Sequence, residues 1–155
     1  MTKRLVLEAE GLVKPVCSKT HIAYSFHLDR RGGKLWIDFA YEPKNLEDRE
    51  QSLPLIAAGV EKYTEPAQRE RLMEKWESFL PLKNLITVSV DDPDRHRGAG
   101  HRHDPEQLLF IGGREASPGF SGGELIEGLW RVTLSLHAIV TDDCRYRLRI
   151  HHEEA

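Results

Sequence analysis

Apolar and polar residues alternate along most of the chain, which is the pattern of β-strands with one buried face. The alternation is strongest in four runs, at residues 22–28, 35–41, 130–138 and 146–150. We interpret the first two runs as one hairpin, turning at Arg31-Gly32-Gly33, and the last two as another, turning at Thr141-Asp142-Asp143. Further strands are predicted at residues 3–13, 85–90 and 107–111. Six or more short strands predict a mainly β fold in which two antiparallel sheets pack together.

One segment, residues 46–80, departs from the alternation and has the spacing of helices. Its apolar stripe consists of Leu72, Met73, Trp76, Phe79 and Leu80. We expect a helix that begins at Glu65 and is capped by Thr64, preceded by a weaker helix over residues 53–63. The segment is interpreted as a helical insertion between two strands, lying over a face or an end of a sheet, with Trp76 as a core anchor.

Composition then limits the class of protein. The chain has 155 residues, 39% hydrophobic and 30% charged, which predicts a single domain over residues 1–155 with a core of ordinary size. A net charge of -3 argues against a dedicated nucleic-acid binder. No apolar run is long enough to span a membrane, and Glu8 and Glu10 interrupt any signal-peptide pattern, so we expect a cytoplasmic protein. Cys17 and Cys144 lie outside any CxxC motif and are expected to be free thiols.

The most unusual segment is the loop predicted at residues 91–104, which concentrates histidines and aspartates. Imidazole nitrogens and carboxylate oxygens are the ligands that zinc and similar divalent ions accept. One hypothesis is therefore a metal site formed by His101, His103 and Asp104. The alternative is a polar loop in which aspartates cap turns and Arg97 pairs with a carboxylate.

If this loop lines a binding surface, a histidine of a later strand is expected to share it. The residues that we then expect to contact a ligand are Asp91, Asp92, Arg97, His101 and His137.

A basic stripe lies on the last predicted strand, where Arg145, Arg147 and Arg149 alternate with apolar residues and are followed by His151 and His152. One interpretation is a contact with an anion or a phosphate. The other is a solvated strand face whose charges discourage edge-to-edge pairing. We favour the second, because the aromatic residues of this strand are expected on the opposite face.

Several phrases of the sequence, taken in order, resemble a known family. They are NLITVSVDDP at 84–93, RGAGHR at 97–102, ASPGF at 116–120, GLWRV at 128–132, LHA at 136–138 and YRL at 146–148. Together they resemble the amino-terminal β-sandwich domain that precedes the PHP-type phosphoesterase domain in a group of bacterial metal-dependent hydrolases, and small stand-alone bacterial proteins of that type. The resemblance implies a jelly-roll-like sandwich. In those hydrolases the metal ligands belong to the following domain, so the resemblance assigns no ligand to these residues.

No phosphate-binding loop, GxSxG elbow or HExxH helix is present in the sequence. We therefore expect a non-catalytic module that binds a small ligand or a protein partner, with no cofactor and no contact to nucleic acid or membrane. Its oligomeric state is left open. The alternative is a small hydrolase that holds a divalent metal such as zinc and uses His101, His103, Asp91 or Asp92, and His137. A third hypothesis is anion binding by the arginine stripe.

Overall fold

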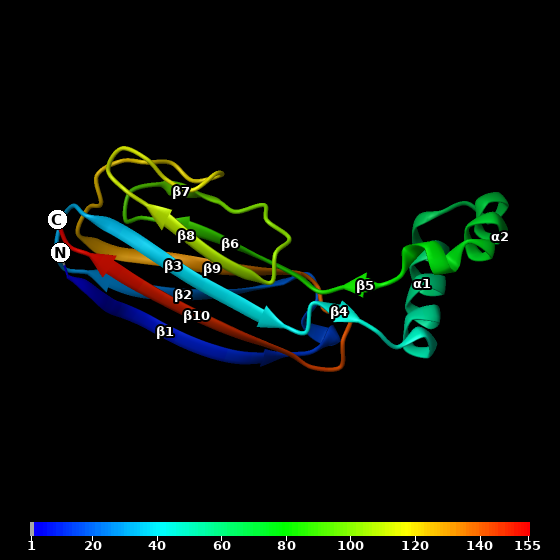
Figure 1. The fold of residues 1–155 in the computed structure, drawn as a ribbon. Helices are drawn as coiled ribbons and strands as arrows, with labels where there is room; N and C mark the ends of the chain where they lie inside the picture. The colour runs from blue at the N-terminus through cyan, green and yellow to red at the C-terminus, as the bar shows by residue number, and fades with distance from the viewer. Residues whose placement is uncertain (1) are drawn as a thin grey trace.

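The strands form two four-stranded antiparallel sheets that pack face to face (Figure 1). The structure is a computed structural model and describes residues 2–155. Sheet A has the strand order β1 (Lys3–Val13), β10 (Cys144–Glu153), β3 (Lys34–Glu42) and β8 (Glu106–Ile111). Sheet B has the order β2 (Thr20–Leu28), β9 (Gly128–Ala138), β6 (Leu85–Asp91) and β7 (His96–Ala99). The predicted mainly β, two-sheet sandwich is therefore confirmed.

Alternate residues of the strands face inward and close the core between the two sheets. Trp130 of β9 is fully buried, stacks with Phe26 of β2 at 6.3 Å between ring centroids, and donates its Nε1–H to the carbonyl of Ile126 at 2.9 Å. Other fully buried side chains are Leu28, Leu35, Ile37, Phe39, Ile86, Leu109, Ile111, Leu125 and Leu134. Burial of each such side chain contributes about 1.5–3 kcal/mol, so these inward faces hold the two sheets together.

The two predicted hairpins are wrong, because the strands of each belong to opposite sheets. β2 pairs with β9, whereas β3 pairs with β10 and β8. Residues 29–33 therefore carry the chain from sheet B to sheet A, and residues 139–143 do the same between β9 and β10. Alternation shows which residues face the core but not which strand is the neighbour. Two consecutive strands have the same alternation of apolar and polar residues whether they are neighbours in one sheet or face each other across the core.

The predicted loop at 91–104 contains a short strand, β7, which pairs with β6 at the edge of sheet B. Beside it, the backbone of Gly98 approaches the segment that contains Gly119 and Phe120. A Cβ atom at Gly98, whose φ is +124°, would lie 2.2 Å from the carbonyl oxygen of Gly119. This close approach therefore requires glycine. The strands predicted at 3–13, 85–90 and 107–111 correspond to β1, β6 and β8.

The helical insertion projects from the end of the sandwich opposite the chain termini (Figure 1). Its elements are β4 (Asn45–Leu46), α1 (Arg49–Tyr63), α2 (Pro66–Glu74), the 3₁₀-helix η2 (Trp76–Phe79) and β5 (Leu82–Lys83); a further 3₁₀-helix, η1 (Pro15–Cys17), connects β1 to β2. We call residues 45–83 the helical arm. β4 and β5 pair as a two-stranded stalk at its base. The predicted insertion is confirmed, and it lies at an end of the sheets.

The helices of the arm do not begin where the sequence pattern placed them. α1 begins at Arg49, ahead of the predicted residue 53, because the Asp48 side chain accepts hydrogen bonds from the N–H groups of Glu50 and Gln51 at 2.8 and 3.1 Å. Thr64 ends α1 instead of capping the next helix. Its N–H and hydroxyl groups both donate to the carbonyl of Val60.

Trp76 is not the core anchor that was predicted. It is partly exposed on the arm, where its ring lies 5.1 Å from the guanidinium of Arg49. The arm has a small buried interior of its own, to which α1 contributes Ser52, Ile56 and Val60. None of the five residues of the predicted apolar stripe is buried, and Phe79 is 43% exposed, so the helical spacing did not identify the buried side of the arm.

Among the residues described, no helix is long and apolar enough to cross a membrane. Both cysteines are free, as predicted: Cys17 is partly buried and Cys144 is buried in the core. Burial raises the pKa of the Cys144 thiol to about 11, so this thiol stays protonated at neutral pH.

Asn84 ties the base of the arm to the sandwich. Its side chain is fully buried and donates Nδ2–H groups to the Pro43 carbonyl at 2.9 Å and to Thr141 Oγ1 at 2.8 Å. Its Oδ1 accepts from the N–H of Val140 at 2.7 Å, and its own carbonyl accepts from Lys44 Nζ at 2.8 Å. One amide thus joins the end of β3, the start of β6 and the connection between β9 and β10.

Replacing Asn84 with Ala is expected to lower the free energy of unfolding by about 2–4 kcal/mol, because the Pro43 carbonyl, the Val140 N–H and the Thr141 hydroxyl lose their partner. Urea unfolding followed by circular dichroism measures the loss. Asn45→Ala is the matched control, since the side-chain oxygen of Asn45 has no hydrogen-bond partner among the described residues. We expect this control to lose about 1 kcal/mol or less. Equal losses in the two variants would contradict the role given to Asn84.

Candidate functional site

Arg97 of β7 is fully buried, which is rare for arginine and requires that its charge be paired. Nη1 donates to Oδ2 of Asp92 at 3.1 Å. Nε donates to the carbonyl of Ser121 at 3.2 Å, and Nη2 to that of Gly123 at 2.8 Å. The guanidinium also lies 5.4 Å from the ring of Trp130. The structural interpretation of the loop, in which Arg97 pairs with a carboxylate, is therefore confirmed.

Asp92 is held as an ionised carboxylate inside the same turn. Its Oδ1 accepts from the N–H groups of Asp94 and Arg95, both at 2.7 Å. Burial by itself would raise the pKa of Asp92, but these two hydrogen bonds and the Arg97 pair outweigh it and hold the pKa below its ordinary value. Asp92 and Arg97 thus use their polar atoms to fix the fold.

The other candidate residues of the loop lie at its surface. Asp91 Oδ1 is 2.8 Å from Nδ1 of His96, and His101, His103 and Asp104 are exposed on the connection between β7 and β8. Within residues 2–155, no group of three or more His, Cys, Asp or Glu side chains is placed to hold a metal ion. The metal site predicted at His101, His103 and Asp104 therefore stays a prediction, and the arrangement of the described side chains does not support it.

His137 lies at the far end of β9 from the aspartates. Its Nε2 is 2.8 Å from the hydroxyl of Thr87, and its side chain is exposed on the outer face of sheet B. Asp91 pairs instead with Arg131, six residues earlier on β9. At a rise of about 3.3 Å per residue this separates His137 from Asp91 by about 20 Å. The structure therefore brings Asp92 to Arg97 but does not bring His137 to the aspartates.

The outer face of sheet A carries the arginine stripe. Strand register places each arginine between strands that bear carboxylates, as in the row Glu8, Arg149 and Asp38. Arg149 Nε lies 3.7 Å from Glu8, and Arg147 Nη2 lies 3.9 Å from Asp38. The stripe does point outward, as predicted. However, β10 is an inner strand between β1 and β3, so its charges do not guard an edge.

One row of this face is apolar and aromatic, and we call it the aromatic row. It runs across all four strands of sheet A in register and consists of Leu5, His151, Trp36 and Phe110. The rings of Trp36 and Phe110 are 5.5 Å apart. Leu108, the neighbouring outward residue on β8, is 60% exposed, and Leu5 is 46% exposed. The sequence analysis did not predict a role for the residues of the aromatic row. The available indication was that Trp36 and Phe110 are aromatic residues at positions where the alternation of their strands predicts polar, outward-facing side chains.

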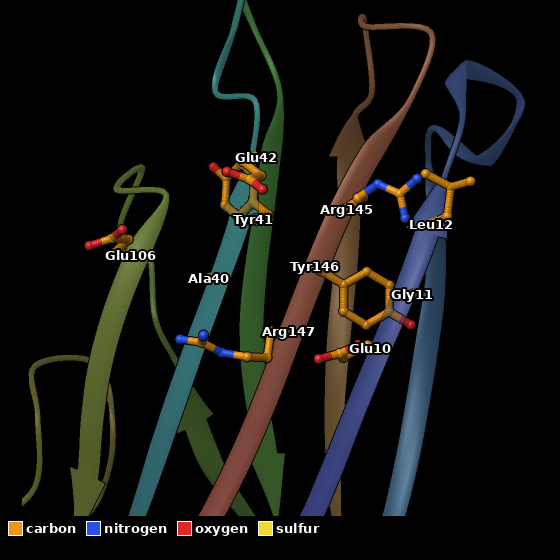
Figure 2. Close-up of a pocket in the computed structure, with 10 residues that line it drawn as sticks. All are labelled: Glu10, Gly11, Leu12, Ala40, Tyr41, Glu42, Glu106, Arg145, Tyr146 and Arg147. Carbon is orange, nitrogen blue, oxygen red and sulfur yellow. The ribbon is translucent and has the colours of Figure 1, made fainter.

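Two depressions lie on the outer face of sheet A, one near the start of β3 and the other near its end. The first, of about 760 Å³, is next to Trp36 and is bounded by Lys34, the turn at residues 112–115 and Glu153; we call it the Trp36 hollow. The second, of about 560 Å³, is the arginine depression (Figure 2). It is lined by Glu10, Gly11, Leu12, Ala40, Tyr41, Glu42, Glu106, Arg145, Tyr146 and Arg147. Both depressions are wide open to solvent and border the charged rows of sheet A.

Comparisons with known proteins found no match: no protein-family model, curated protein or solved structure matches the chain. The resemblance to the sandwich domain of PHP-type hydrolases therefore stays a prediction, and function has to be inferred from the geometry above.

Removing the side chain of Arg97 is expected to cost about 3–5 kcal/mol of unfolding free energy, because Arg97→Ala leaves the buried carboxylate of Asp92 without its counter-charge. Chemical denaturation measures the change. Arg95→Ala, two residues away and exposed, is the control and should cost about 0.5 kcal/mol or less. A loss below about 1 kcal/mol for Arg97→Ala would show that the pair does not stabilise the fold.

Asp92 is expected to make the free energy of unfolding decrease as the pH becomes acidic. Its folded pKa is lowered, so its contribution is fully present above the unfolded pKa of about 4 and is lost as the pH falls through the folded value. Asp92→Asn should therefore be less stable than the wild type at neutral pH, with a smaller further loss below about pH 4. Urea midpoints measured at steps of pH test this. The same acid dependence in both proteins would contradict it.

Proposed function

We propose that the chain is a non-catalytic β-sandwich module that holds a ligand against the outer face of sheet A. The observation that carries the proposal is the aromatic row, which places Trp36 and Phe110 among the charged rows of sheet A and close to the Trp36 hollow. Aromatic side chains supply large contact areas and dominate the energetics of binding surfaces. Exposed apolar strips rimmed by polar residues are typical of such surfaces.

The non-catalytic character is supported by how the candidate catalytic residues are used. Asp92 and Arg97 are bonded within the fold, and His137 is exposed with Thr87 on the opposite face of the molecule. Acid–base and electrostatic catalysis are most effective where the reacting group is held away from bulk water. An open sheet face does not provide such an environment, whereas it suits reversible binding.

A cytoplasmic location is part of the proposal. Its support is that Cys17 and Cys144 are both free thiols, as is usual for proteins of a reducing compartment.

Ligand contact at the aromatic row is expected to move the indole N–H resonance of Trp36 in ¹H–¹⁵N spectra, because this N–H lies 3.1 Å from Glu153 beside the Trp36 hollow. The probes are three chemical classes: neutral oligosaccharides, heparin as a polyanion and polylysine as a polycation. One class should shift the Trp36 resonance and leave that of the buried Trp130 in place. If no class moves the Trp36 resonance at millimolar concentration, the proposal is wrong.

Two leucines give a matched pair of variants for the same experiment. Leu108 on sheet A and Leu129 on sheet B are each 60% exposed, so replacing either with Ala should leave stability almost unchanged. We expect Leu108→Ala to weaken binding of the active probe and Leu129→Ala to leave it unaltered. Equal effects of the two substitutions would place the ligand elsewhere on the molecule.

A further inference from the structure

The charges on the outer face of sheet A are of both signs and nearly balanced. The basic side chains are Lys3, Lys34, Arg145, Arg147 and Arg149, and the acidic ones are Glu8, Glu10, Asp38, Glu42, Glu106 and Glu153. Such a face has no extended field of one sign, so it does not favour a polyanion or a polycation. It favours a neutral ligand that both donates and accepts hydrogen bonds.

Several of these charged side chains have donors or acceptors that are not used in close hydrogen bonds within the protein. The distance from Arg147 to Asp38 is 3.9 Å and that from Arg149 to Glu8 is 3.7 Å, both too long for strong hydrogen bonds. Figure 2 shows the Arg147 side chain reaching from β10 to β3, and Arg147 lines the arginine depression. An arginine carries five N–H donors, and a carboxylate has about four acceptor positions, so unsatisfied donors and acceptors lie side by side here.

The aromatic row adds an apolar contact next to this polar surface. Trp36 and Phe110 are partly buried with their ring centroids 5.5 Å apart, and the exposed side chain of Leu108 occupies the next outward position on β8. Lys3 Nζ lies 4.4 Å and Lys34 Nζ 5.9 Å from the centroid of the Trp36 ring, and Lys34 Nζ also lies 5.2 Å from that of Phe110. A ligand on these rings therefore displaces both lysine side chains, which are long and flexible. A ligand that suits this face therefore needs an apolar side for the rings and closely spaced hydroxyl groups for the charged rows.

Sugar rings have both properties, because their C–H faces are apolar and their hydroxyl groups donate and accept. We infer that the ligand of this face is a neutral oligosaccharide, lying along β3 from Trp36 to the arginine depression; this rests on the function proposed above. Trp36 and Glu42 are six residues apart on β3. At a rise of about 3.3 Å per residue this is about 20 Å, which calls for a chain of several sugar units.

Calorimetric titration with cellohexaose, xylohexaose and mannohexaose tests the inference. At least one of these probes should bind, and its affinity should fall about tenfold or more in Trp36→Ala and about fivefold in Arg147→Ala. Leu129→Ala should bind as the wild type does. Raising NaCl from about 0.05 M to about 0.5 M should leave the affinity unchanged, because the ligand carries no charge to be screened. If Trp36→Ala does not fold, Leu108→Ala replaces it.

The outcomes separate the two proposals. If heparin or polylysine shifts the Trp36 resonance and the neutral oligosaccharides do not, the sugar class is wrong while the binding face stands. If none of the probes shifts it, both proposals fall. An oligosaccharide that binds all the variants as tightly as the wild type would bind elsewhere, which also overturns both.

Discussion

The constraint on which the rest of the structure depends is that consecutive strands must close one apolar core between two sheets. The chain meets it by crossing repeatedly from one sheet to the other, and the crossings at residues 29–33 and 139–143 are two of these. As a result, sheet A is assembled from the first strand, the last strand and two strands from the middle of the sequence. Its outer face therefore combines residues that are far apart in the chain, and Leu5, His151, Trp36 and Phe110 come into one row only through this crossing.

Two buried polar side chains fix the connections that the core alone leaves free. Arg97 joins the turn at Asp92 to the segment at residues 121–123, and Asn84 joins the base of the helical arm to the connection between β9 and β10. Each is fully buried and makes several hydrogen bonds, which is the condition under which a buried polar group stabilises a fold. Of the loop residues that the sequence singled out, Asp92 and Arg97 are thus bonded within the fold, whereas His101, His103 and Asp104 are exposed.

The helical arm is a separate body on a short stalk. It buries its own apolar side chains on α1 and meets the sandwich through contacts such as that of Lys19 Nζ with the hydroxyl of Tyr63, 2.9 Å apart. An apolar groove of about 390 Å³ lies along α1 and includes Gly59, where an added Cβ would meet open space. Glycine inside a helix lowers stability by about 1 kcal/mol relative to alanine. Gly59 lies in the arm, so this cost is not offset by any packing in the sandwich core.

The sequence by itself determined the strands of the two sheets other than β7, the outward direction of Arg145, Arg147 and Arg149, the place of the helical insertion and the carboxylate partner expected for Arg97. These follow from local periodicity and from the cost of burying a charge without a partner. Only the tertiary structure decided which strands are neighbours. A strand that packs across the core from another has the same alternation of apolar and polar residues as a strand that is hydrogen-bonded beside it. That choice separated the strands of both predicted hairpins, placed Asp91 of β6 opposite Arg131, six residues from His137 on β9, and brought Trp36 and Phe110 together on sheet A.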